Sequence, residues 1–391
     1  MSRENIYLDH SATTPTDPEV LGAMMRYFAH HYGNPASGHR FGREARQAID
    51  TAREQVAALI GATPEEIIFT GGGTESDNLA LLGAAYGETG KRNHIITSAI
   101  EHYAVLNTCK HLADRGFSVT FLPVDSQGTV DPDDARRAMT EKTLLVSIMH
   151  ANNEIGTVEP LAEIAFEARR RGILVHTDAV QSVGKIPVRV SELGLDLLSL
   201  TGHKFYGPKG TGALYVRHGT NLAPIMFGGH QERGFRTGTE NVPGIVGLGK
   251  ACELAGRDLP WQMERMMALR QTLEKLISEK IAAVRINGHP FRRLPHVLSV
   301  SFRGVAGDAV VQELDRQGVA ASAGAACTSG AVHISHVLAA LGIPEDYGPG
   351  TVRFSLGKGN TEEQLCSAAD LLAEIVGQLR GNRATATCPS R

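Results

Sequence analysis

Residues 173–204 read ILVHTDAVQSVGKIPVRVSELGLDLLSLTGHK, and this stretch decides the fold. Two apolar runs, Ile173–Asp178 and Leu195–Leu200, have the length and composition of strands that are buried on both faces. The first run ends on Asp178, and the second is followed by Thr201–Lys204. We therefore expect neighbouring strands of an α/β sheet, in which ligands bind at the carboxyl ends of the strands.

The same alternation of short apolar runs and amphipathic stretches continues on both sides. Further strands are predicted at Glu66–Thr70, His94–Ser98, Phe117–Pro123, Thr143–Met149 and Gly212–Val216. Helices are predicted at Glu75–Tyr86, from His102 onward, and at Glu159–Arg171. Strands separated by helices of this length predict an α/β fold with a mostly parallel seven-stranded sheet, covered by helices on both faces.

From about Asp258 the pattern changes to that of a smaller α+β domain. Its predicted elements are helices at Pro260–Ala282, from Ala306 and at Glu362–Arg380, with strands at Val297–Phe302, Val319–Ser322 and Thr351–Leu356. We expect residues 16–258 to form the large domain. Residues 1–15 and 259–380 would form the small domain, and residues 381–391 a disordered tail.

Composition excludes several classes of protein. The chain has 391 residues and a formal net charge of −3, and its basic residues form no stripe, which argues against a nucleic-acid-binding module. No apolar run approaches the roughly 18 residues of a membrane helix, and the first residues lack the apolar region of a secretory signal. The five cysteines are widely spaced and form no C-x-x-C pair, which predicts free thiols and a cytoplasmic location.

Lys204 and Asp178 together indicate a site for a covalent cofactor. A lysine just after a buried strand is placed to form a Schiff base, which desolvation assists by lowering the pKa of the amine. A carboxylate at the end of an apolar strand needs a cationic partner, such as the protonated ring nitrogen of pyridoxal phosphate. Taken singly, Lys204 could be a surface lysine and Asp178 a helix cap, but the pair favours the cofactor.

Three further segments carry candidate site residues, each with a plainer alternative. Gly71–Thr74 opens a helix whose N–H groups suit a phosphate, or it is a glycine turn with Thr74 as the helix cap. Cys327 lies among small residues, which predicts a reactive thiol on a flexible loop; the alternative is an incidental buried cysteine. Arg353 could bind a carboxylate in bidentate fashion, or it is a charge on an edge strand.

The chain resembles cysteine desulfurases of the NifS/IscS type, which belong to the class-V aminotransferases among the fold-type-I pyridoxal-phosphate enzymes. The resemblance extends from Tyr7–Thr14 (YLDHSATT) to Arg380. The other matching segments are Gly73–Asn78, Glu101-His102, Ala151–Gly156, His176–Gln181, Gly202–Lys204, Gly228–Arg233, Arg236–Asn241 and Ala326–Gly330. One departure is Ala331–Ser335 (AVHIS), where relatives commonly carry Leu-Glu-Pro-Ser.

The resemblance implies a role for each matching position. Lys204 would hold pyridoxal 5'-phosphate as a Schiff base, Asp178 would pair with the ring nitrogen, and Gln181 with the ring hydroxyl. His102 would stack on the ring and move protons. The phosphate would be bound by Gly73, Thr74, Thr201, His203 and, across the interface of a homodimer, Thr239. The substrate carboxylate would be held by Asn153 and Arg353, with Asn34 nearby.

The implied reaction converts L-cysteine to alanine. Lys204 would remove the Cα proton, and the thiolate of Cys327 would take the sulfur as a persulfide. The persulfide would supply iron–sulfur cluster assembly through a NifU/IscU-like scaffold protein, with nitrogenase clusters and tRNA thiolation as other possible destinations. Cys327 is also a candidate transient ligand of an iron–sulfur cluster.

Three rival functions stay open at this point. A selenocysteine lyase would use the same cofactor site. A simple transaminase needs no thiol, so Cys327 argues against it. A non-catalytic, cofactor-binding scaffold for assembly partners would have no use for the combination of Lys204, His102, Arg353 and Cys327.

Overall fold

The computed structural model describes residues 5–90, 92–328 and 331–386. Its larger part is built on a sheet of β2 (Ile67–Thr70), β3 (His94–Ser98), β4 (Ser118–Leu122), β5 (Thr143–Ser147), β6 (Leu174–Asp178), β7 (Leu197–Thr201) and β8 (Gly212–Val216). The strand order is β2-β8-β7-β6-β5-β3-β4. Only β8 runs antiparallel to its neighbours in this sheet. The predicted α/β class and mostly parallel seven-stranded sheet are therefore confirmed.

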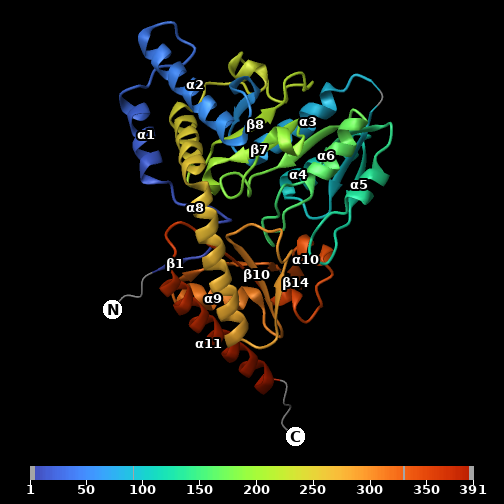
Figure 1. The fold of residues 1–391 in the computed structure, drawn as a ribbon, viewed down its shortest axis with the longest axis vertical. Helices are drawn as coiled ribbons and strands as arrows, with labels where there is room; N and C mark the ends of the chain where they lie inside the picture. Colours follow the sequence, from blue (N-terminus) through green and yellow to red (C-terminus); the bar gives the residue numbers. More distant parts are fainter. Residues whose placement is uncertain (1–4, 91, 329–330, 387–391) are drawn as a thin grey trace.

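Helices cover both faces of this sheet (Figure 1). They are α1 (Pro18–Ala29), α2 (Arg40–Ile60), α3 (Gly73–Gly87), α4 (Tyr103–Ala113), α5 (Pro132–Ala138), α6 (Leu161–Arg170) and α7 (Val190–Leu193), with 3₁₀ turns η1 (Pro64–Glu66), η2 (Gly202–Lys204) and η3 (Gln231–Gly234). Successive residues of β5 show why the strands are apolar throughout. Leu145 packs into the core on one face and Val146 into the core on the other, and neither side chain is exposed.

The smaller part lies below the large sheet in Figure 1. It contains an antiparallel sheet in the order β12-β15-β10-β9, built from β9 (Val284–Asn287), β10 (Val297–Phe302), β12 (Ser322–Ala323) and β15 (Thr351–Ser355). It also holds α9 (Gly307–Arg316), α10 (His336–Ala340), η4 (Gly348–Gly350), α11 (Glu362–Ala386) and the hairpin β13 (Ala325–Thr328) and β14 (Ala331–Ile334). The N-terminal β1 (Ile6–Tyr7) pairs in parallel with β11 (Val319–Ala320).

The long helix α8 (Val242–Lys280) runs from the larger part into the smaller one (Figure 1). Its Leu254 packs into the core of the large sheet and its Met266 into the core of the small one. The sequence predicts a helix that starts at Pro260, where a helical pattern rich in Met, Leu, Glu and Arg begins. That start is wrong: the helix begins at Val242 and continues through Pro260, since packing on both sides outweighs one lost backbone hydrogen bond. The predicted domain boundary after residue 258 thus falls inside one helix.

Two other expectations need correction. The predicted strand Val319–Ser322 is two short strands, because β11 pairs with β1 whereas β12 pairs with β15. Residues 381–386, predicted as part of a disordered tail, continue α11 as helix. This helix is anchored where Arg380 donates to the carbonyl oxygen of Ala282 at 2.9 Å. Residues 387–391 lie outside the described part. Within the described residues, no helix is long and apolar enough to cross a membrane.

Candidate active site

Lys204 ends the η2 turn, directly after β7. Its Nζ donates to the carbonyl oxygens of Ser11 at 2.7 Å and Ala12 at 2.8 Å, so the amine is enclosed and is not a surface lysine. Burial and, next, the charge of Arg353 lower the pKa of Lys204 to about 8. An amine with this pKa has a neutral, nucleophilic fraction near physiological pH, as Schiff-base formation requires.

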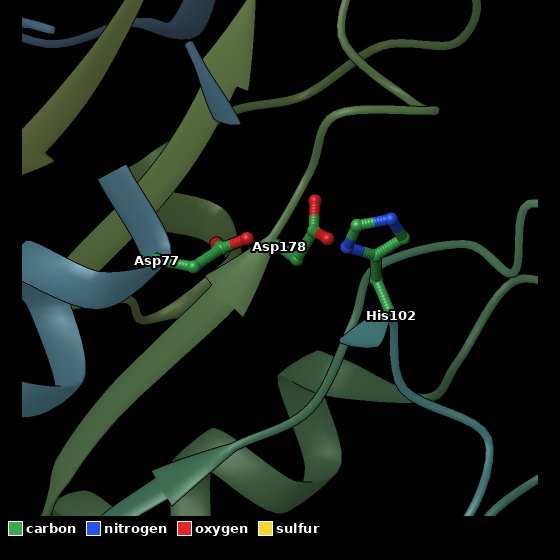
Figure 2. A group of neighbouring side chains, drawn as sticks. All are labelled: Asp77, His102 and Asp178. Carbon is green, nitrogen blue, oxygen red and sulfur yellow. The ribbon is translucent and has the colours of Figure 1, made fainter. Parts of the chain in front are cut away.

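Asp178 is the last residue of β6 and is buried. One carboxylate oxygen accepts the Val180 N–H at 2.9 Å, so Asp178 does cap the following turn, but the other oxygen is left for a ligand. Burial raises the pKa of Asp178, whereas the Val180 N–H, His102 and Lys204 lower it. Figure 2 shows the carboxyl group beside the ring of His102. A cation placed against Asp178 would favour its ionised form.

His102 is the N-cap residue of α4, and its Nδ1 accepts the Ala104 N–H at 3.1 Å. The neutral ring therefore carries its proton on Nε2. The His102 side chain is exposed, so a flat aromatic ligand could stack on its ring. Sequence and structure agree on where His102 sits: just beyond the end of β3.

The turn Gly71–Gly73 leads directly into α3. The N-cap is Gly72, which offers no side chain, and the N–H groups of Gly73 and Thr74 have no hydrogen-bond partner in the described chain. Thr74 lies inside the first turn of the helix, so the interpretation of Thr74 as the helix cap is wrong. A bare helix N-terminus of this kind suits an anion.

A hollow of about 820 Å³ opens over this helix end. It is lined by Ala12, Thr13, Gly71, Gly72, Gly73, Thr74, Glu75, Asn78, Thr201, His203, Lys209 and Gly210. The predicted phosphate ligands Gly73, Thr74, Thr201 and His203 therefore line one space. A Cβ atom on Gly73 would come within 2.6 Å of Cγ2 of Val180, so only glycine fits there without displacement.

These groups fit pyridoxal phosphate at three separate points. The unpartnered helix end suits a phosphate, the amine of lowered pKa suits an aldehyde, and the buried carboxylate suits a protonated ring nitrogen. Gln181 lies beside Lys204, because its Nε2 donates at 3.0 Å to the same Ser11 oxygen. Thr239 is exposed, in the connection between η3 and α8, and its predicted contact across a dimer stays a prediction.

Arg353 lies on β15, between β12 and β10, so the interpretation as an edge-strand charge is wrong. Its guanidinium donates to Asn153 O at 2.9 Å and to Asp9 Oδ1 at 2.7 Å, while its buried Nε has no partner. The structure thus brings Arg353 and Asn153 together. Asn34 Oδ1 accepts the Ala36 N–H in the loop after α1, and no described hydrogen bond joins Asn34 to Arg353, so its place near the substrate carboxylate stays a prediction.

The backbone of Cys327 lies on strand β13, opposite Val332 of β14, where the sequence predicts a flexible loop. The hairpin begins next to Arg353, because Ser322 of β12 pairs with Arg353 of β15. At its other end, Ser335 donates to Glu154 at 2.6 Å. The segment that leads into the hairpin with Cys327 therefore lies beside Arg353. The side chain of Cys327 lies outside what the structure describes.

Two site residues escaped the sequence analysis. Asp77 is almost fully buried on α3, and its side-chain atoms lie within 4.8 Å of those of His102 and Asp178. Asp9 is the ionic partner of Arg353. The signal for Asp77 was present, because it is a charged residue on the face of a helix that is otherwise rich in Leu, Ala and Gly. Asp9 follows a strand of only two residues, for which no periodic pattern exists.

Comparison with known proteins identifies the class. The family model described as aminotransferase class-V matches residues 6–367, and the chain belongs to this family. A cysteine desulfurase IscS of Dictyoglomus turgidum is 50% identical over 97% of this chain and 96% of its own length. One of Methanosarcina thermophila is 48% identical over 97% of this chain and 94% of its own length.

Solved structures give the same result. A NifS-like protein superposes with a TM-score of 0.91 at 39% identity, covering 96% of this chain and all of the other. A structure described as SspA in complex with cysteine superposes with a TM-score of 0.79 at 38% identity, covering 90% of this chain and 98% of the other. Within the class-V aminotransferases, the chain is thus similar to cysteine desulfurases over nearly its full length.

Proposed function

We propose that the chain is a pyridoxal-phosphate-dependent cysteine desulfurase, which converts L-cysteine to alanine and passes the sulfur to Cys327. The observation that carries this proposal is the enclosed amine of Lys204, which lies near Asp178. Both Lys204 and Arg353 contact the same N-terminal segment, Lys204 at Ser11 and Arg353 at Asp9. The near-full-length similarity to cysteine desulfurases supports the choice of substrate.

The cofactor would be held by Lys204 through its aldehyde, by Asp178 at the ring nitrogen and by the N-terminus of α3 at the phosphate. Its ring supplies an electron sink next to the Cα atom of the bound amino acid. Gln181 and the stacked ring of His102 would fix its orientation. The low pKa of Lys204 suits a second task, because the released amine can take the Cα proton.

Arg353 would bind the substrate carboxylate, assisted by Asn153. The Arg353 side chain is only 12% exposed and already pairs with Asp9, so the substrate would share the arginine with this carboxylate. The unpartnered Nε offers an additional donor. Bidentate binding of this kind fixes the direction in which the Cβ–S bond of the substrate points.

Cys327 would complete the reaction. Its thiolate attacks the substrate sulfur, the Cβ–S bond breaks, and the new S–S bond leaves a persulfide on Cys327 while Cβ gains a proton and alanine departs. Reductant or an acceptor protein then removes the sulfur. We infer a NifU/IscU-like iron–sulfur scaffold as that acceptor and a homodimer as the working form, with Thr239 reaching the phosphate of the other copy. Cys109, Cys252 and Cys366 are free thiols, in keeping with the predicted cytoplasmic location.

The proposal is tested by incubating the protein with L-cysteine and a reductant, and by measuring alanine and sulfide. Wild type should release both in equal amounts. Cys327→Ala should lose both products and keep its cofactor absorbance. Undiminished alanine release by this variant would contradict Cys327 as the acceptor and favour a lyase, in which the cofactor site alone cleaves the bond.

A further inference from the structure

Asp77 is a buried carboxyl group that the proposed chemistry does not use. It lies on α3, on the side of Asp178 that faces away from His102 in Figure 2. The side chain is 1% exposed, and its Oδ1 has no hydrogen-bond partner. The nearest charged or titratable contact of Oδ1 is Nε2 of His176, at 3.6 Å.

His176, the neighbour that contacts Oδ1 of Asp77, provides no positive charge. His176 on β6 is fully buried, with Nδ1 at 2.8 Å from the Ser147 hydroxyl and Nε2 at 3.0 Å from the Ser199 hydroxyl. Burial lowers the pKa of His176 to about 3, so the ring is neutral. The Ser199 side chain lowers the pKa of the Asp77 carboxyl group, but its hydroxyl is neutral.

A third carboxyl group, Glu101, adds to the same buried region. It accepts hydrogen bonds from the Ser98 hydroxyl at 2.6 Å and from the Met149 N–H at 2.9 Å. Burial raises the pKa of Glu101 to about 8. Asp77, Glu101 and Asp178 therefore lie in the same buried region. Ionising all three would be very costly, because three like charges would be buried together.

The contacts of Asp77 and Asp178 indicate which of the two carboxyl groups is protonated and which is ionised. Asp178 interacts with the charge of Lys204 and accepts the Val180 N–H, whereas Asp77 has neither of these contacts. For Asp77, burial and then the charge of Asp178 raise the pKa well above its ordinary value, and Glu101 adds to this effect against the hydrogen bond from Ser199. Of the two aspartates, Asp178 is the one equipped to be ionised.

We infer that Asp77 carries a proton in the cofactor-loaded protein, which leaves Asp178 as the ionised carboxylate opposite the ring nitrogen. This inference rests on the cofactor assigned under the proposed function. A single negative charge then sets the protonation of the ring nitrogen. A second ionised carboxylate at Asp77 would add a further charge that no described cation balances.

Infrared spectroscopy of the cofactor-loaded wild type and of two variants tests the inference. Isotope-labelled aspartate separates aspartate bands from those of Glu101 and other glutamates. We expect the C=O stretch of a protonated aspartate, which Asp77→Asn removes. Asp196→Asn is the matched control, since Asp196 is equally buried but pairs with Arg217, and it should leave the band in place.

Cofactor affinity gives an independent readout. Asparagine resembles a protonated carboxyl group, so Asp77→Asn should bind pyridoxal phosphate within about twofold of wild type and keep the pH midpoint of the cofactor absorbance. A missing aspartate band, or affinity reduced by about tenfold or more with a displaced midpoint, would overturn the inference. If wild type binds no pyridoxal phosphate at all, the proposed function fails and this inference falls with it.

Discussion

At the scale of single residues, the position of a lysine decides whether it can hold the cofactor, and a lowered pKa alone does not. Burial lowers the pKa of Lys185 to about 7, which is even lower than that of Lys204. Yet the Lys185 ammonium lies 4.9 Å from the ring centroid of Tyr206, whereas Lys204 follows the end of a sheet strand. Only Lys204 is placed to meet a ligand held by Asp178.

Borohydride reduction of the cofactor-loaded protein should therefore fix the cofactor on Lys204. Peptide mapping by mass spectrometry identifies the modified lysine. Lys204→Ala should lower turnover by roughly a thousandfold or more, because it removes both the attachment point and the base. Attachment to Lys185 in wild type would contradict this assignment.

Cofactor loading should depend on pH through Lys204. Its folded pKa, about 8, lies below the ordinary 10.5, and the reactive form is the neutral amine, so the loading rate should rise as pH increases through about 8. Arg353 contributes to the lowering, so Arg353→Gln should move the midpoint of the rate profile to higher pH. Stopped-flow absorbance measures the rate. A midpoint that stays in place would show that Arg353 does not act on Lys204.

At the scale of elements, the proposed phosphate site requires the turn between β2 and α3 to bring its backbone close to the phosphate. Gly73→Ala should weaken cofactor binding by about tenfold or more, because the added Cβ would press on Val180. Gly22→Ala on α1 is the matched control, since nothing lies within 4 Å of its added Cβ. Fluorescence titration with pyridoxal phosphate compares the two. Equal affinities in both variants would count against the phosphate site.

Elements whose sequence signal is local were predictable. The apolar run at Val297–Phe302 corresponds to β10 residue for residue, and Lys204 and Asp178 lie at the predicted strand ends. Elements that depend on partners far away in the sequence could not be predicted. The separation of β11 from β12 depends on β1 and β15, and the course of α8 through Pro260 depends on two cores. Asp9 joins the site only through such a tertiary contact, its ion pair with Arg353.

At the scale of the whole molecule, buried neutral histidines tie stability to pH. Burial lowers the pKa of His10, His150 and His203 to about 4, and that of His176 to about 3. The unfolded chain binds more protons than the folded one below the ordinary pKa of 6.5, so this contribution to stability is lost as pH falls from about 6.5 toward 4. Burial raises the pKa of Glu101 and Glu159 to about 8. Their contribution to stability is therefore lost in the opposite direction, as pH rises from about 4.5 to 8.

His150→Gln should isolate one of these contributions. The glutamine amide does not titrate, so the variant should lose less unfolding free energy than wild type between about pH 6.5 and 4, by up to about 3 kcal/mol. Urea unfolding followed by circular dichroism at several pH values measures the slope. Comparing slopes removes any constant cost of losing the contact between His150 and Ser182. Identical slopes would mean that His150 is not buried neutral.

The central claim, transfer of sulfur from L-cysteine to Cys327, is tested most directly by a single turnover without reductant. Peptide mass spectrometry then locates the transferred sulfur, and alanine is counted in the same sample. We predict one additional sulfur atom on the peptide that contains Cys327 for each alanine formed. Alanine formed without sulfur on Cys327, or with sulfur on Cys109, Cys252 or Cys366 instead, would contradict the account.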